Sequence, residues 1–175
     1  MSVNIADDGS ICGWASVYGV RDSHADVVER GAYTDTLKDW ARKGKLPCMM
    51  LMHNMGPLTS DMLPIGRWTK MVDDPYGLWC EGQLSLGNST ARDIYALIKD
   101  KCLDGLSIGF SPVKFQMMPR NSDIKRKLIS VKLHEVSVVT SPSNPESLIT
   151  RVKSHDDEGA RLKRALAELA AAVRS

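Results

Sequence analysis

The chain has 175 residues, of which 43% are hydrophobic and 25% are charged, and its formal net charge is +2. This composition is typical of a globular domain and excludes a largely disordered chain, while the balanced charge argues against a surface dedicated to nucleic acid or membranes. No apolar run approaches the roughly 20 residues of a membrane-spanning helix, and the polar, acidic N-terminus shows no secretory signal. We therefore expect one compact domain with a core of its own.

The first predicted elements are a strand, a helix and a second strand. Residues 11–18 have the character of a strand, and a polar loop follows through Gly31. Residues 33–43 place apolar side chains at helical spacing, with Gly44 where a C-terminal cap belongs. The apolar run 46–53 is bounded by glycine and a turn-like segment, which predicts a buried strand.

Four further strands and one helix are predicted in the rest of the domain. The strands, each bounded by turn or helix signals, are residues 65–72, 78–85, 105–117 and 126–140. A Pro-plus-Gly connection joins the first two as a hairpin. The helix covers residues 90–101, with Ser89 or Thr90 as its N-terminal cap. Together these elements predict an α+β fold, a mainly antiparallel sheet or β-barrel with two packed helices.

The C-terminal segment differs in character from the rest of the chain. Acidic residues open it, and apolar side chains then recur at three- and four-residue intervals, at Leu162, Leu166, Leu169 and Val173. We place a boundary near residue 153, which divides the chain into a domain of residues 1–153 and an amphipathic helix or tail of residues 154–175.

The four cysteines, at positions 12, 48, 80 and 102, contain no CxxC pair. Without an export signal, this spacing predicts reduced thiols in a cytosol-like compartment. A zinc site of Cys48, His53, Cys80 and Cys102 would lack the paired ligand spacings of structural zinc. We therefore expect buried, unreactive thiols.

The segment GLSIGF at residues 105–110 satisfies the GxSxG pattern around Ser107. In α/β-hydrolases this serine lies on a sharp strand-to-helix turn. Here apolar residues alternate with Ser107, Gly109 and Ser111, which predicts a continuous strand that presents the serine on a sparsely covered face. The pattern predicts an accessible serine but not that fold.

A serine nucleophile requires a base, which is usually histidine. His24 lies in a polar loop and His155 in the charged start of the tail, so we expect both to be solvated. His53 ends an apolar strand at a turn, where its ring can be half-buried at the rim of a cleft. A packed histidine with no catalytic role is the alternative interpretation.

Glu135 lies in the longest predicted strand, on a face that otherwise reads Ile129, Val131, Leu133, Ser137 and Val139. Burying a carboxylate on such a face costs several kcal/mol unless it is paired, so a partner is implied. A structural cation such as Arg67 and the imidazole of His53 are equally good candidates for that partner.

The ordered series of these features resembles the prohead maturation proteases of tailed bacteriophages, a serine peptidase family related to the herpesvirus assembly proteases. The resemblance covers about residues 11–153. Its landmarks, in chain order, are residues 13–18 with 22 and 26–28, 31–33, 53 with 64–66, 77–78 with 81–82, 105–110, 133–139 and 142–145.

This resemblance implies a herpesvirus-protease-like fold and an endopeptidase that acts inside the assembling procapsid in the host cytoplasm. Its substrates would be scaffold or the scaffold-like arm of the major capsid protein, and the enzyme itself. The family's histidine falls on His53, its serine on Ser107 and its acidic residue on Glu135. Because the herpesvirus enzymes use a second histidine, His134 is the alternative third member, although strand alternation favours Glu135. We expect no metal or cofactor, no specific nucleic acid, no membrane, and self-association of the chain.

Two other interpretations remain. The apolar stripe of the tail is also typical of a non-catalytic assembly or scaffolding protein that recruits a shell through a short coiled coil. The basic run 125–127 is a weak indication of nucleic-acid binding, because three basic residues in a turn are usually solvated.

Overall fold

The computed structural model describes residues 8–53 and 63–152. Within these ranges the elements are, in order, β1 (Ser10–Val17), β2 (Asp26–Val28), α1 (Thr34–Arg42), β3 (Cys48–Leu51), β4 (Gly66–Asp73), β5 (Gly77–Leu84), α2 (Ser89–Lys99), β6 (Gly105–Met117), β7 (Arg126–Val139) and β8 (Ile149–Val152). The predicted α+β class is confirmed. The predicted C-terminal helix and the boundary near residue 153 lie outside the described residues.

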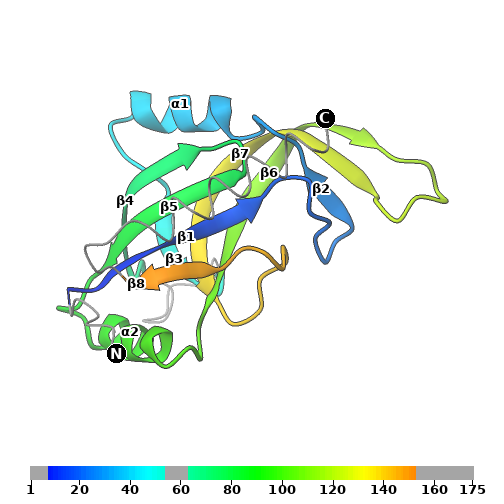
Figure 1. Cartoon of the computed structure of the whole chain (residues 1–175). Helices are drawn as coiled ribbons and strands as arrows, with labels where there is room; N and C mark the ends of the chain where they lie inside the picture. Colours follow the sequence, from blue (N-terminus) through cyan, green and yellow to red (C-terminus); the bar gives the residue numbers. More distant parts are fainter. Residues whose placement is uncertain (1–7, 54–62, 153–175) are drawn as a thin grey trace.

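The strands form one mixed sheet whose order is β2-β7-β3-β4-β5-β1-β8, with β6 paired to β7. Most neighbours are antiparallel, whereas β2 and β3 both run parallel to β7 along one of its edges. β6 occupies the other edge of β7, and the two long strands project together as the hairpin at the right of Figure 1. The ends of the sheet approach each other through one isolated bridge, Gly105 with Leu148, rather than through a ladder. The structure therefore shows a curved mixed sheet and not a fully laddered barrel.

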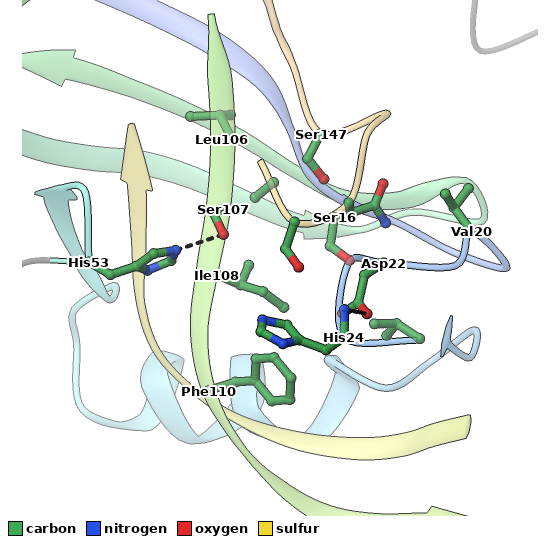
Figure 2. Close-up of a pocket in the computed structure, with 14 residues that line it drawn as sticks. Ser16, Val20, Asp22, His24, His53, Leu106, Ser107, Ile108, Phe110 and Ser147 are labelled. Atoms are coloured by element: carbon green, nitrogen blue, oxygen red, sulfur yellow. Dashed lines mark hydrogen bonds between the residues drawn. The ribbon is translucent and has the colours of Figure 1, made fainter. Parts of the chain in front are cut away.

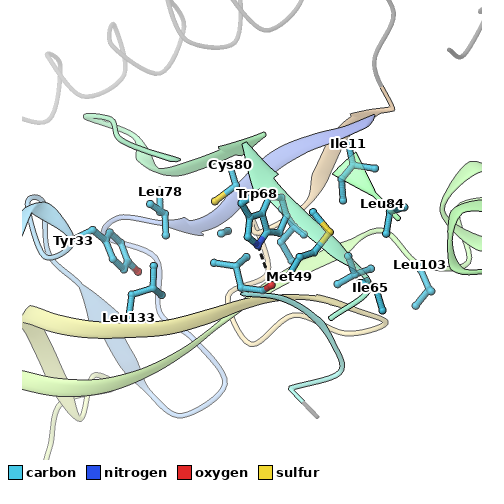
Figure 3. Packing of buried hydrophobic residues seen from close by; sticks show 14 of the residues in the cluster. Ile11, Tyr33, Met49, Ile65, Trp68, Leu78, Cys80, Leu84, Leu103 and Leu133 are labelled. Atoms are coloured by element: carbon cyan, nitrogen blue, oxygen red, sulfur yellow. Dashed lines mark hydrogen bonds between the residues drawn. The ribbon is translucent and has the colours of Figure 1, made fainter. Parts of the chain in front are cut away.

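The hydrophobic core lies between the strands of this curved sheet and the two helices (Figure 3). Tyr33, Met49 and Leu78 are among the largest side chains that are completely buried in it. Within the core, the buried hydroxyl of Tyr33 has no hydrogen-bond partner among the described residues, whereas the indole Nε1 of Trp68 donates to the carbonyl of Val136 at 3.2 Å. This contact ties β4 to the strand that carries Glu135.

Helix α1 is fastened to β7 by two side chains. The indole Nε1 of Trp40 donates to the carbonyl of Leu133 at 2.9 Å, and the N–H of Leu133 donates to the Thr36 hydroxyl at 3.0 Å. The helix ends as predicted, since Gly44 follows it with φ of +65°. α1 therefore fixes the backbone of β7 two residues before Glu135.

Several predicted boundaries are corrected by the structure. The polar loop predicted through Gly31 contains the short strand β2, and β8 follows the prolines at 142 and 145. The N-cap of α2 is Asn88 rather than Ser89 or Thr90, because its side chain accepts from the N–H of Thr90 at 2.9 Å. Both missed strands are short and take their partners from distant parts of the chain, so local periodicity does not reveal them.

The predicted apolar face of β7 is correct near the site and wrong towards the start of the strand. Leu133, Glu135 and Ser137 are buried on one face as expected. Ile129 is 36% exposed whereas Leu128 is completely buried, the reverse of the prediction. The β6–β7 ladder changes register at three points, and each bulge shifts the alternation of the side chains.

Neither helix in the described part of the chain has the length and apolar character of a membrane-spanning segment.

Candidate active site

Ser107 lies on β6, with the strand continuing on both sides of it as predicted. Gly105 and Gly109, two residues before and after Ser107, lack a side chain because nearby atoms leave no room for one. A Cβ atom on Gly105 would lie 2.8 Å from Cδ of Pro142, and one on Gly109 would lie 2.2 Å from Oε1 of Glu135. The glycines of the GxSxG pattern therefore make room for the segment after β7 and for the carboxylate, and they form no hydrolase elbow.

His53 reaches the site through a turn, as predicted, but the turn begins at Met52, two residues earlier than predicted. β3 ends at Leu51, and Met52 and His53 both adopt left-handed backbone conformations, with φ of 53° and 55°. Had the strand continued in register with β7, His53 would lie level with Thr140, about 16 Å along the strand from Glu135. The turn folds the chain back, and the N–H of His53 then donates to the hydroxyl of Ser137 at 3.1 Å.

The structure brings His53, Ser107 and Glu135 together. Nδ1 of His53 lies 2.6 Å from Oε1 of Glu135, and Nε2 lies 2.8 Å from Oγ of Ser107. The carboxylate is 3% exposed, whereas the imidazole is 40% exposed. An imidazole held this way, with its Nδ1–H donating to the carboxylate, presents Nε2 as an acceptor for the serine proton. The arrangement can therefore activate the hydroxyl as a nucleophile.

The pair of His53 and Ser107 opens onto a pocket of about 110 Å³ (Figure 2). Ile108 and Phe110 of β6 form part of its apolar lining. Its other side includes Asp22 and His24 from the loop between β1 and β2, as Figure 2 shows. The pocket adjoins the serine, so a group bound in it would lie next to the Ser107 hydroxyl.

The sequence did not predict that His24 and Asp22 would line this pocket. His24 is exposed, as expected for a loop residue, but the loop is folded against the site. The Oδ1 atom of Asp22 accepts the N–H groups of His24 and Asp26, each at 2.8 Å, and the N–H of Ser23 donates to the carbonyl of Ser143 at 2.9 Å. The spacing of Asp22 and His24 is typical of an Asx turn, and that was the signal available in the sequence.

His134 lies away from this site. Its Nε2 atom is 2.8 Å from Oγ of Ser111, in an exposed pair, and no carboxylate of the described residues is bonded to it. Among the described residues, serines of β6 thus form two Ser–His pairs, one with His53 after β3 and one with His134 on β7, and the pair at Ser107 is the one that is joined to a buried acid. Strand alternation accounts for the difference between adjacent residues His134 and Glu135.

The other partners considered from the sequence lie elsewhere. Arg67 is exposed on β4, and the described ion pairs of Glu135 involve His53 alone. In the predicted basic run, Arg126 forms an ion pair with the buried Asp26, and Lys127 pairs with Glu29 at 2.9 Å. These two basic side chains connect β7 to the segment around β2.

The expectation that the cysteines are buried holds for one of them. Cys80 is buried, Cys12 is partly buried, and Cys48 and Cys102 are exposed. Burial raises the pKa of the Cys80 thiol well above its usual range. Among the described residues, no group of three or more His, Cys, Asp or Glu side chains is arranged to hold a metal ion.

The fold and the site define a serine-hydrolase-like centre on the mixed sheet of an α+β fold. The serine lies on β6, the acid on the neighbouring β7, and the histidine just after β3, which pairs with β7. The family profile of the Caudovirus prohead serine proteases matches residues 1–161. The chain belongs to this family, and the family resemblance seen in its sequence is confirmed.

The proteins similar to the chain include two curated relatives and a solved structure. The prohead protease of Enterobacteria phage HK97 is 33% identical over 146 residues, which cover 82% of this chain and 60% of the relative. The capsid polyprotein of Pseudomonas phage PAJU2 is 43% identical over 101 residues, covering 54% of this chain and 15% of the polyprotein. The chain thus spans less than two thirds of each relative. The bacteriophage T4 capsid assembly protease, gp21, has a TM-score of 0.59 at 13% identity over 74% of this chain and 80% of that one, which is a likeness of fold.

Proposed function

We propose that the chain is a serine endopeptidase of phage head maturation in which Ser107 is the nucleophile, His53 the general base and Glu135 the third member. The proposal rests mainly on the two short hydrogen bonds of His53, to the carboxylate and to the hydroxyl. Membership of the prohead serine protease family gives independent support. The protease domain would comprise residues 1–153, followed by the tail of residues 154–175.

In the proposed reaction, Oγ of Ser107 attacks the scissile carbonyl while Nε2 of His53 takes the hydroxyl proton. The imidazolium gives this proton to the leaving amine, and an acyl-enzyme remains. Water, deprotonated by the same imidazole, then releases the acyl group and regenerates the serine. Glu135 keeps the ring in the productive orientation and stabilises its positive charge, and no step requires a metal or cofactor.

The substrates we propose are scaffold or the scaffold-like arm of the major capsid protein, and the protease itself, within an assembling procapsid in the host cytoplasm. A stretch of the PAJU2 capsid polyprotein that is 43% identical to this chain supports a link to capsid proteins. Self-association of the chain is part of the same proposal. The alternative is a non-catalytic assembly protein, which would bind the capsid protein without cutting it.

Co-expression with the capsid protein of the same phage tests this function. Wild type should shorten the capsid protein or itself, and mass spectrometry of the products locates the cut. Ser107→Ala should lower the rate by about 10⁶ because the nucleophile is lost. Ser111→Ala is the matched control, since it removes the serine of the second Ser–His pair on the same strand and should cut normally.

Cleavage that survives in Ser107→Ala would contradict the assignment of the nucleophile. A wild-type chain that binds the capsid protein and leaves both proteins intact would instead support the assembly role.

A further inference from the structure

The hydroxyl of Ser137 contacts both Glu135 and His53, at atoms that the proposed triad does not use. It donates to Oε2 of Glu135 at 2.6 Å and accepts the backbone N–H of His53 at 3.1 Å. We propose that Ser137 is a positioning residue, which sets the orientation of the Glu135 carboxylate relative to His53. This inference rests on the proposed function, since it assigns the support of that same site.

The carboxylate requires such a partner because it is almost completely buried. Oε1 of Glu135 faces the imidazole, and the Ser137 hydroxyl donates to the other oxygen, Oε2. Without a donor, Oε2 would be desolvated and unpaired, and the carboxylate would be free to rotate away from the imidazole. Ser137 therefore fixes the plane of the carboxylate as well as its position.

The histidine also requires support because of its backbone. Met52 and His53 are two consecutive non-glycine residues with positive φ, a conformation that costs free energy at each position. The N–H of Met52 is held by the carbonyl of Val138 at 3.0 Å, and that of His53 by the hydroxyl of Ser137. One hydroxyl thus contacts both ends of the Glu–His pair, and it can do so because it is a donor and an acceptor at once.

Ser137 is placed to affect chemistry rather than substrate binding. Its side chain is 0% exposed, and it is not one of the residues that line the pocket beside Ser107. It follows Glu135 by two residues on β7, so both side chains point to the same face of the strand. A change at Ser137 should therefore lower kcat and leave KM nearly unchanged.

Kinetics of Ser137→Ala with a peptide that spans the mapped cleavage site test this proposal. We expect kcat to fall about 10- to 100-fold, with KM within about threefold of wild type, as for residues that orient a catalytic group. Thr36→Ala is the matched control: it also removes a buried hydroxyl that accepts a backbone N–H, here that of Leu133 on the same strand. It should lower the melting temperature without lowering kcat to this extent.

A double-mutant cycle asks whether Ser137 acts through Glu135. In a Glu135→Gln background, Ser137→Ala should lower kcat by clearly less than it does in wild type. An equal fold-change in the two backgrounds would show that Ser137 does not act through the carboxylate and would overturn the proposal.

The pair Ser137→Thr and Ser137→Val keeps the test decisive if the alanine variant does not fold. Threonine and valine have nearly the same shape, and only threonine keeps the hydroxyl. Threonine should be at least tenfold faster in kcat, whereas equal values would overturn the proposal. Ser107→Ala is measured alongside: if it still cleaves, the proposed function fails, and if it is inactive while Ser137→Ala is normal, the positioning role alone fails.

Discussion

Gly109→Ala should slow catalysis through a single added carbon atom. The Cβ atom would lie 2.2 Å from Oε1 of Glu135 and 2.9 Å from its Cγ and Cδ atoms. Gly109 is paired with Glu135 in the β6–β7 ladder, so the new atom points directly at the side chain opposite. The carboxylate would have to move, because the backbones of the two strands are fixed by their ladder.

The size of this movement can be worked out from the structure. A carbon and an oxygen in contact approach to a little over 3 Å, so the carboxylate would retreat by about 1 Å. The present bond from Oε1 to Nδ1 of His53 is 2.6 Å, and a retreat of that size lengthens it to the limit of a hydrogen bond, about 3.5 Å. Misplacement of a catalytic group by 1 Å costs about 10²-fold in rate, which is our expectation for kcat.

The assay is steady-state cleavage of the peptide used for the wild type, together with thermal unfolding. Gly87→Ala is the control, because a Cβ atom at Gly87 meets nothing within 4 Å and its φ is not positive. We expect Gly87→Ala to behave as wild type, and Gly109→Ala to remain folded but slow. A Gly109→Ala enzyme within threefold of wild type would refute the role of Glu135 in holding the imidazole.

Two further predictions concern the acid and the thiols. Glu135→Gln should lower kcat, but its loss should be several orders of magnitude smaller than that of Ser107→Ala, and His134→Ala should leave kcat unchanged. If cleavage assays instead show that Glu135→Gln is unchanged and His134→Ala is inactive, His134 is the third member of the triad. In alkylation followed by mass spectrometry, the exposed Cys48 and Cys102 should react first. Cys80 should react only on unfolding, because burial raises the pKa of its thiol. Rapid labelling of Cys80 in the native protein would contradict its place in the core.

The three proposed site residues could be selected from the sequence because each carries a local signal. Ser107 alternates with apolar residues, and Glu135 is a carboxylate on an apolar face, which implies a partner. His53 stands where an apolar run ends. The signals at Ser107 and Glu135 are periodicities of two residues, and they reflect burial on one face of a strand. For that reason they predicted which side chains point inward, and the resemblance to a family then placed them in one site.

What the sequence did not reveal depends on contacts between distant segments. The left-handed turn at Met52 and His53 contains no glycine, so the sequence placed the end of the strand two residues too late. The bulges that expose Ile129 arise from the pairing of two strands rather than from either strand alone. The sequence placed Ser137 on the same face of the strand as Glu135. A serine among valines, however, indicates a role only when its two hydrogen-bond partners are known.

The site depends on the register of two ladders that share β7. Ser107 lies opposite Ser137 in the antiparallel ladder with β6, and Met50 lies opposite the same residue in the parallel ladder with β3. A slip of one residue in either ladder would turn the serine away from the carboxylate or carry the histidine turn out of reach. β6 has 13 residues to hold its register, whereas β3 has four, so the histidine is carried by the weaker of the two pairings. The bond from the His53 backbone to the Ser137 hydroxyl anchors the chain just after the last residue of this short ladder, which is where the histidine needs support.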